Sequence, residues 1–393
     1  MNTFTPNQLN RAAPRQQSIL LSEYMALAAA TDRLPADDLK PVLLGLFGEV
    51  GSIMATAKKL HREKSAYVGY RHAVEEEFGD ALWYFAALCR RLAFPLDEIM
   101  SAATRNGKYR TAVAAGALTP GPISEVSSLI ASPAIDDALL NLGVSVADLL
   151  SVATSYDSAR LRIIAFADCY LHALQAANVA FNDVVHANLS KARGRFLMPD
   201  IADLPSFDAR FPQDERLPDQ FEIVIRQRSS GKTCLQWNGV FIGDPLSDNI
   251  RDPDGYRFHD VFHFANAAVL HWSPTFRALI KHKRRSDPAL EEAQDSGRAI
   301  VVEEGLSAWI FSCAKQLDFF EGQRGVSFDL LKTVGQFVSG YEVDACPLKL
   351  WEDAILQGYG VFRQLRANSG GIITGDRSRR HIEYRALSAG SSS

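Results

Sequence analysis

Four acidic residues near the start of the chain have the types and spacing of a magnesium site. Glu49 lies within a glycine-rich stretch, and Glu76, Glu77 and Asp80 follow it. The i, i+3 spacing of Glu77 and Asp80 puts both on one helix face, and antiparallel packing would bring Glu49 opposite them. Burying such a cluster is costly without a cation, and Mg²⁺ prefers oxygen ligands that it shares with phosphates. The alternative is a set of solvated acids on helix surfaces.

A second group of residues, far along the chain, could hold a transition metal. His259 and His263 are one helical turn apart, with Asp260 between them. Histidines at this spacing can chelate a metal, and Glu303 and Glu304 at the start of a later apolar run could supply a third ligand. The alternative is a structural, hydrogen-bonded histidine pair.

The same region has a weak internal parallel to the first group. Residues 258–262 parallel residues 78–82, and residues 304–307 parallel residues 49–52. The C-terminal region would then be a rearranged relative of the first bundle, with Arg257 standing where a metal-binding Glu belongs. Such a copy would lack part of its metal site.

Apolar spacing predicts the elements that position the first group. Four helices with short connections are expected between residues 18 and 110, which favours an antiparallel bundle. Residues 111–125 are small and rich in Pro and Gly, which predicts a linker. A helical block follows over residues 135–196, and its residues 173–185 resemble residues 87–99 at an offset of 86. This indicates either a decayed repeat or a chance likeness of alanine-rich helices.

The last part of the chain begins with strands and returns to helices. Residues 221–226 and 234–237 read as short strands, with Asn238 and Gly239 as a hairpin turn. Helical periodicity covers about residues 256–365. The fold class is therefore mainly α, with a small β-hairpin.

Composition excludes several classes of protein. The 393 residues are 47% hydrophobic and carry a net charge of −4, which argues against a general nucleic-acid binder. The five cysteines form no Cys-x-x-Cys pair, and no stretch is long and apolar enough to cross a membrane. A cytoplasmic protein is expected. The basic run at residues 281–285 reads as a solvated helix end, and Gly231-Lys232-Thr233 lacks the first glycine of a phosphate-binding loop.

Residues 18–112 resemble the MazG-type all-α nucleoside triphosphate pyrophosphohydrolases. The resemblance rests on Gly45-Leu-Phe-Gly-Glu-Val-Gly51, Glu77-Phe-Gly-Asp-Ala-Leu-Trp-Tyr84 and Asn106-Gly-Lys-Tyr-Arg110. It implies Mg²⁺-dependent hydrolysis of a (deoxy)nucleoside triphosphate between its α- and β-phosphates. The C-terminal region resembles an extension found on some MazG-like bacterial proteins.

The resemblance also implies the metal ligands. In the family, Glu-x-x-Glu on the second helix and Glu-x-x-Asp on the third bind the metal, which carries over to Glu49, Glu77 and Asp80. Ser52 stands where the second Glu of the first pair belongs. Losing one anionic ligand predicts weaker Mg²⁺ binding, and is compatible with a weak enzyme, a changed metal stoichiometry or a catalytically retired domain.

The remaining roles are assigned by chemistry. Glu76 could take the proton of the attacking water. Lys108 with Arg105 or Arg110 would clamp phosphates, or would only complement the end of a helix. Trp83 could stack on a base, or be a core aromatic.

These observations predict five segments: a polar tail (1–17), the MazG-like domain (18–112), a linker and helical block (113–198), an α-rich domain with a hairpin (199–367) and a mobile tail (368–393). The resemblance implies a homodimer, although the helical block could supply the same packing within one chain. Two rival functions stay open. One is a non-catalytic nucleotide sensor or assembly module with a separate C-terminal ligand site, and the other is a C-terminal metal hydrolase unrelated to nucleotides.

Overall fold

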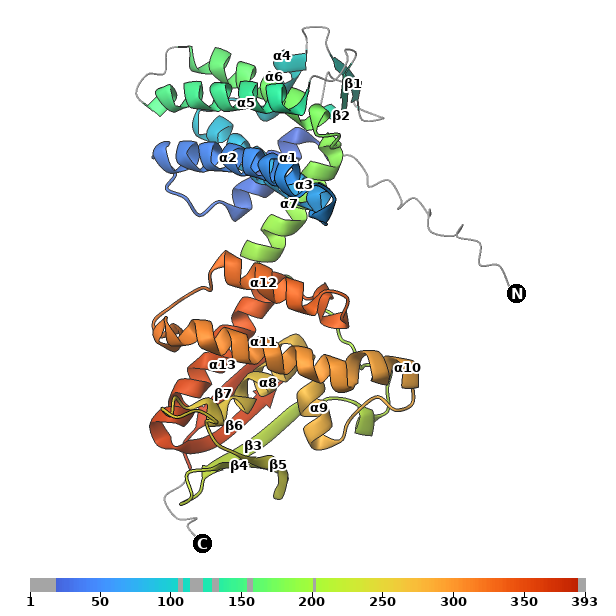
Figure 1. Ribbon diagram of the computed structural model, residues 1–393, viewed down its shortest axis with the longest axis vertical. Coiled ribbons are helices and arrows are strands. Elements are labelled where there is room, and N and C mark those ends of the chain that lie inside the picture. Colours follow the sequence, from blue (N-terminus) through green and yellow to red (C-terminus); the bar gives the residue numbers. More distant parts are fainter. Residues whose placement is uncertain are drawn as a thin grey trace, which may run out of the picture. The chain divides into compact units, whose positions relative to one another are not determined.

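The chain folds into two units. The computed structural model describes residues 19–104, 134–153, 158–200 and 203–387, and the backbone of residues 109–113 and 123–128. Residue contacts divide the chain into residues 1–196 and 197–393. Both units contain helices, and a small five-stranded antiparallel sheet lies in the second (Figure 1). The predicted mainly α fold class is confirmed.

In its described residues, the first unit contains the four helices expected between residues 18 and 110, and three more in the expected helical block of residues 135–196. Pro41 is the second residue of the longest helix, α2. In the first turn of a helix the backbone N–H has no partner within the helix, so the missing N–H of proline costs nothing there. Its helices are α1 (Leu21–Thr31), α2 (Lys40–Glu63), α3 (Tyr70–Arg91), α4 (Leu96–Thr104), α5 (Ile135–Leu149), α6 (Ala159–Ala176) and α7 (Phe181–Phe196).

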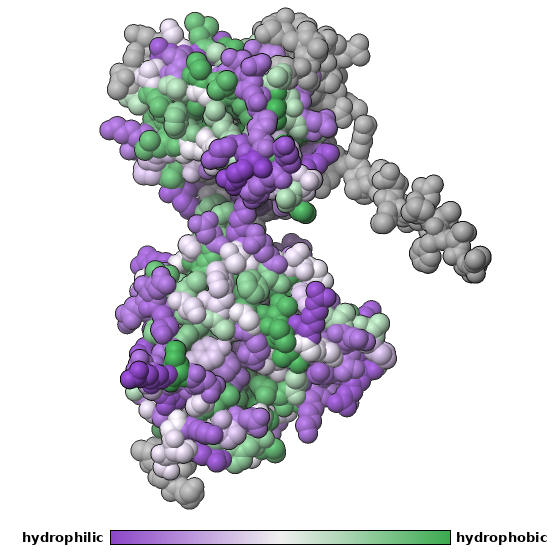
Figure 2. Space-filling model, viewed as in Figure 1, coloured by the Kyte–Doolittle hydropathy of each residue, from purple (hydrophilic) through white to green (hydrophobic). Residues whose placement is uncertain are grey.

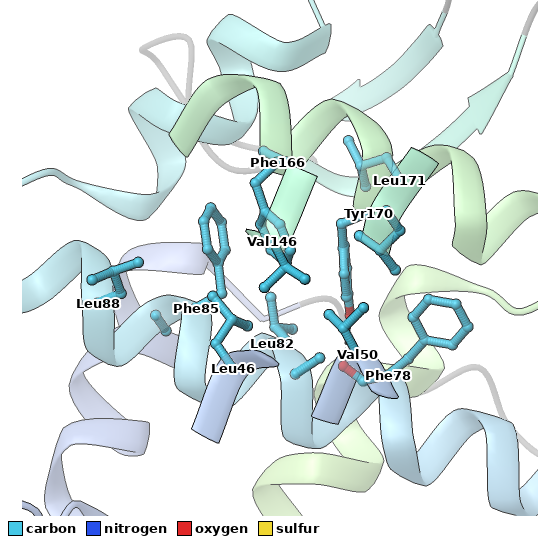
Figure 3. Close-up of a cluster of buried hydrophobic side chains, with 14 of the residues drawn as sticks. Leu46, Val50, Phe78, Leu82, Phe85, Leu88, Val146, Phe166, Tyr170 and Leu171 are labelled. Atoms are coloured by element: carbon cyan, nitrogen blue, oxygen red, sulfur yellow. Dashed lines mark hydrogen bonds between the residues drawn. The ribbon is translucent and has the colours of Figure 1, made fainter. Parts of the chain in front are cut away.

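All seven helices share one core. In Figure 3, Leu46 from α2 and Phe85 from α3 face Val146 from α5 and Phe166 from α6. The hydroxyl of Tyr170 on α6 donates to the backbone carbonyl of Phe78 over 2.8 Å. The helices of residues 113–198 therefore complete the hydrophobic core of the first four, which alone would leave one face of α2 and α3 uncovered.

One glycine sets how closely a side chain of α3 approaches α2. A Cβ atom added at Gly45 would lie 2.1 Å from the ring of Tyr84, whereas one added at Gly48 would meet nothing within 4 Å. Gly45 therefore permits the close approach of Tyr84 to α2, and Gly48 has no such role.

Gly45→Ala should destabilise the protein by about 1–2 kcal/mol, because the Tyr84 ring has to move out of its packed position. Gly48→Ala is the matched control on the same helix. It should be neutral or stabilise by about 0.5–1 kcal/mol, because alanine favours the helix and fills open space. Urea unfolding of the full chain followed by circular dichroism compares them. Equal effects of the two substitutions would contradict the packing argument.

The predicted linker contains strands. Residues 109–113 form β1 (Tyr109–Val113) and residues 123–128 form β2 (Ile123–Ser128), which pair antiparallel. These strands were not predicted from the sequence, because each is only five or six residues long and the segment is rich in small residues, Pro and Gly, which is typical of a linker.

Apolar side chains gather on one face of the first unit. Figure 2 shows them over α2 and α5, and the exposed ones include Leu44, Phe47, Leu140 and Val144. The predicted homodimer stays a prediction.

Among the described residues no single helix is long and apolar enough to span a membrane, and α6 with α7 passes that test only as a pair bent by 100°.

The second unit is built around an antiparallel sheet in the order β5-β4-β3-β6-β7. Asn238 and Gly239 both have positive φ, which is the conformation of a tight hairpin turn between β4 and β5. The expected hairpin is thus the first part of a larger sheet. Its strands are β3 (Gln220–Gln227), β4 (Thr233–Trp237), β5 (Val240–Leu246), β6 (Gly370–Asp376) and β7 (His381–Arg385).

The predicted mobile tail is wrong over its described part. Strand β6 pairs with β3 along its whole length, and β7 pairs with β6. Ile373 and Ile382 are buried in the core of the unit. Gly and Arg in this segment suggested mobility, but Gly371 and Gly375 leave room for the rings of Tyr384 and Phe221.

Helices cover the sheet in layers. Helices α8 and α13 contact β6 and β7, and α11 packs on α8, α9 and α12 (Figure 1). A π-helical turn, η6 (Asn266–Leu270), follows α8 directly. The other helical elements are η5 (Tyr256–Phe258), α8 (Asp260–Ala265), α9 (Pro274–Ile280), α10 (Pro288–Leu290), η7 (Glu291–Asp295), α11 (Gly297–Lys315), η8 (Asp318–Phe320), α12 (Phe328–Val338), η9 (Glu342–Ala345) and α13 (Leu348–Asn368).

Candidate metal centres

Two helices of the first unit bring together the acids expected to bind magnesium. Glu49 projects from α2, and Glu77 and Asp80 project from α3 one turn apart. One carboxylate oxygen from each lies within 4.8 Å of the others. We call these three residues the carboxylate cluster. Three oxygen donors at this separation fit a hard divalent cation such as Mg²⁺.

Helix α7 adds a cation that sequence spacing did not identify. Lys191 Nζ donates to Glu76 Oε1 over 2.8 Å and also to Asp80. Asn188 Nδ2 lies 3.4 Å from Asp80 Oδ1, and the Asn188 side-chain oxygen accepts from the buried Tyr24 hydroxyl over 2.8 Å. Asp80 is thereby positioned by two residues of α7.

The 86-residue offset in the sequence was the signal that could have identified this lysine. At the offset of 86 residues, Lys191 is the counterpart of Arg105, one of the predicted phosphate ligands. The breaks between helices also fall at equivalent places, after Arg91 in α3 and after Ala176 in α6. Helix α7 comes close to α3 at Gly79, where an added Cβ would lie 3.0 Å from Asn188 Cβ.

The electrostatics of the cluster favour a cation. Burial raises the pKa of Glu49 to about 7, and the nearby charges of Asp80 and Glu77 add to the effect, while Lys191 opposes it. For Lys191, burial lowers the pKa but Asp80 and Glu76 outweigh burial, so its pKa is raised and the ammonium stays charged. One ammonium facing several carboxylates leaves an excess of negative charge.

Because the pKa of Glu49 is raised, the stability of the metal-free protein should depend on pH. Glu49 takes up its proton at higher pH in the folded state than in the unfolded state, so its contribution to stability is full below about pH 4.5. That contribution is lost as pH rises through about 7. In EDTA, Glu49→Gln should therefore stabilise the protein relative to wild type at pH 8, by about 2 kcal/mol after allowance for solvent screening, and not at pH 4.5.

Urea unfolding at the two pH values measures this difference. Glu98→Gln is the control, because Glu98 is exposed on α4 and outside the cluster. A stabilisation by Glu49→Gln that is the same at pH 4.5 and pH 8 would contradict the raised pKa.

The other predicted residues of the first unit are only partly placed. Ser52 is half-buried on α2, one turn after Glu49. Trp83 Nε1 donates to Thr31 Oγ1 over 2.8 Å, and its ring packs edge-on against Tyr84. Arg105 and Lys108 lie outside the described residues, and Arg110 is described only as backbone in β1.

The second predicted group is also brought together. Helix α8, with His259 directly before it, places two histidines and Asp260 beside two acids of α11. We call these five residues the histidine cluster: His259, Asp260, His263, Glu303 and Glu304. Burial alone would lower the pKa of His263, but Glu303 and Glu304 outweigh burial and raise it well above its usual value. Burial would raise the pKa of Glu304, but His259 and His263 hold it far below its usual range.

Comparison with known proteins gives one family match, which lies in the second unit. Residues 202–388 match the family model of the MazG C-terminal domain. Neither the curated proteins nor the solved structures contain a match to this chain. The family match supports a MazG-related protein and indicates a nucleotide-related function.

Proposed function

We propose that the first unit hydrolyses a (deoxy)nucleoside triphosphate between its α- and β-phosphates, releasing a monophosphate and pyrophosphate. The observation that supports this most is the carboxylate cluster, in which Glu49, Glu77 and Asp80 converge from α2 and α3. The match of residues 202–388 to a MazG-related domain agrees with it, since it links the same chain to nucleotide chemistry. The resemblance of residues 18–112 to the family supplies the reaction.

Each residue of the site then has a proposed role. Glu49, Glu77 and Asp80 would hold Mg²⁺, which when bound neutralises phosphate charge and makes water a better nucleophile. Glu76 would accept a proton from the attacking water, because its carboxylate shares Lys191 with Asp80 and so is fixed beside the cluster. Lys108, Arg105 and Arg110 would bind the phosphates.

Ser52 leaves the cluster with one anionic ligand fewer than the family pattern. A hydroxyl is a weaker ligand for Mg²⁺ than a carboxylate. Lys191 reduces the net negative charge further. Both features predict a weaker affinity for Mg²⁺ than four carboxylates would give, and a need for the substrate phosphates to complete the site.

The test is a product assay on the full chain. The protein is incubated with Mg²⁺ and each common NTP and dNTP, and monophosphate and pyrophosphate are separated and quantified. Formation of both products in equal amounts, lost in Glu77→Gln and kept in Glu98→Gln, would support the proposal.

Two results would overturn the proposed enzyme. One is the absence of product above the blank with every nucleotide, and the other is product formation undiminished in Glu77→Gln. Nucleotide binding without turnover, measured by calorimetry, would favour the alternative of a non-catalytic sensor, for which the ion pairs between Lys191 and the acids of α3 are the supporting observation.

A further inference from the structure

The histidine cluster orders its two imidazole rings in the same way. His259 Nδ1 lies 2.9 Å from the backbone oxygen of Tyr256, and His263 Nδ1 lies 3.1 Å from Glu303 Oε1. Each Nδ1 therefore faces an acceptor. With Nδ1 facing these acceptors, Nε2 is the nitrogen of each ring that a metal ion could bind in place of a proton.

Both Nε2 atoms face Glu304. His259 Nε2 lies 3.6 Å from Glu304 Oε2, and His263 Nε2 lies 3.3 Å from Glu304 Oε1. Two ligands bound tetrahedrally at 2.0–2.1 Å from one metal ion lie about 3.3–3.4 Å apart. The His263 separation matches that of two atoms bound to one ion, and the His259 separation is slightly longer, so Glu304 could share an ion with both rings through its two oxygens. Asp260 is close enough to be a fourth ligand, since one of its oxygens and one nitrogen of each ring lie within 4.8 Å of one another.

The side chain of His263 is fully buried without a proper hydrogen bond. Among the described residues, neither of its ring nitrogens has a hydrogen bond of good geometry, although the carboxylates of Glu303 and Glu304 are near. Buried polar atoms in folded proteins nearly always have a partner, so an orphaned nitrogen calls for one. A metal ion between the rings would supply it for Nε2.

Glu303 is held as a fixed acceptor behind His263. It is completely buried, and it accepts hydrogen bonds from the side chains of Asn266 and Ser273 and from the backbone N–H of Thr275 at 2.9–3.1 Å. A buried carboxylate behind a histidine is the usual partner that orients a metal-binding imidazole. The π-helical turn η6 that begins at Asn266 is a feature often found at functional sites.

The charges of the cluster also require a cation. Three carboxylates face two imidazoles, and among the described residues no Lys or Arg forms an ion pair with any of the three. The nearest basic residue in sequence, Arg257, is paired with Asp248. Even with both imidazoles protonated, three ionised carboxylates leave an excess of negative charge, and a divalent ion would offset that excess.

We propose that the second unit binds one divalent transition-metal ion, of the zinc, iron or manganese class, through His259 Nε2, His263 Nε2 and Glu304, with Asp260 beside them and Glu303 as the positioning residue for His263. The Glu304 side chain is 37% exposed, so a metal ion could enter and leave the site from solution on that side. Imidazole ligands favour such ions over Mg²⁺, whereas the all-oxygen carboxylate cluster favours Mg²⁺. The two sites can therefore be told apart by metal.

The test loads EDTA-treated full-length protein with Co²⁺ or Zn²⁺ in the presence of excess Mg²⁺, which occupies the carboxylate cluster. Bound metal is counted by mass spectrometry after gel filtration, and Co²⁺ is followed by its visible absorption. About one equivalent is expected in wild type. Glu304→Gln should weaken binding at least tenfold and His263→Gln should abolish it.

Matched controls come from β7, where His381 lies 4.0 Å from Glu383 in an exposed pair. His381→Gln and Glu383→Gln should bind metal as wild type does. Glu303→Gln should lower affinity about 10- to 100-fold and shift the Co²⁺ absorption, which a merely structural role would not do.

Equal metal content in wild type and Glu304→Gln, or no metal in wild type, would overturn the proposal. If His263→Gln does not fold, Glu304→Gln decides, because its side chain is partly exposed. Loss of this metal is independent of the product assay with Glu77→Gln, so failure of one proposal leaves the other standing.

Discussion

Asp80→Asn should lower kcat for triphosphate hydrolysis by about a thousandfold, equivalent to about 4 kcal/mol of transition-state stabilisation. The substitution keeps the shape of the side chain and removes its charge. Asp80 is the acid of the cluster that Lys191 and Asn188 both position, so an asparagine there would keep the position and lose the charge that binds the metal. Steady-state rates at saturating Mg²⁺ give the change in kcat, and calorimetry gives the change in Mg²⁺ affinity.

The control for this prediction is Asp137→Asn. Asp137 is exposed on α5 and has the same chemistry outside the cluster. It should keep full activity, and circular dichroism should show the same helix content in both variants. An Asp80→Asn protein that retains more than a tenth of the wild-type rate would rule out metal binding by this carboxylate as the basis of activity.

Asp208→Ala should destabilise the second unit by about 3–5 kcal/mol. Asp208 is 1% exposed and accepts hydrogen bonds from Arg277 and Arg377 at 2.6 and 2.8 Å, and from the backbone N–H of Leu217. Burial raises its pKa, but the two guanidinium groups outweigh burial and hold the pKa below its usual value. Removing it leaves two buried positive charges without this partner.

A matched control uses the same arginine. Asp219 also pairs with Arg377, at 3.5 Å, but its side chain is 95% exposed. Asp219→Ala should therefore cost less than about 1 kcal/mol. Urea unfolding followed by tryptophan fluorescence reports mainly on the second unit, because four of the five tryptophans lie after residue 197. Similar losses from the two substitutions would show that burial does not govern these pairs.

Local patterns in the sequence predicted the helices of the first unit and the turn at Asn238 and Gly239, because apolar spacing and turn chemistry act over a few residues. They could not predict that β6 joins β3. Residues 368–393 are rich in Gly, Ser and Arg, a composition that is also typical of mobile tails. The reason for Gly371 and Gly375 appears only in the folded sheet, where they leave room for the rings of Tyr384 and Phe221.

For the candidate sites, spacing identified the acids of α2 and α3 and the histidines of α8, because each pair lies one helical turn apart. Glu303 and Glu304 were found as a neighbouring acidic pair, but their different places, one buried behind His263 and one at the surface, depend on the packing of α11. Lys191 was missed because a lone lysine near a helix end carries no local sign of what it faces. Only the 86-residue offset related it to a predicted ligand.

The position of β6 in the sheet has a consequence for synthesis. Ile223 in β3 pairs with Ile373 in β6, about 150 residues later. At about 5–20 residues per second, the ribosome needs roughly 10 to 30 s between them. During that time β3 and β4 have an open edge whose apolar residues can pair with other chains. We expect nascent chains halted before residue 370 to require chaperones, and chains released after β7 to fold without them.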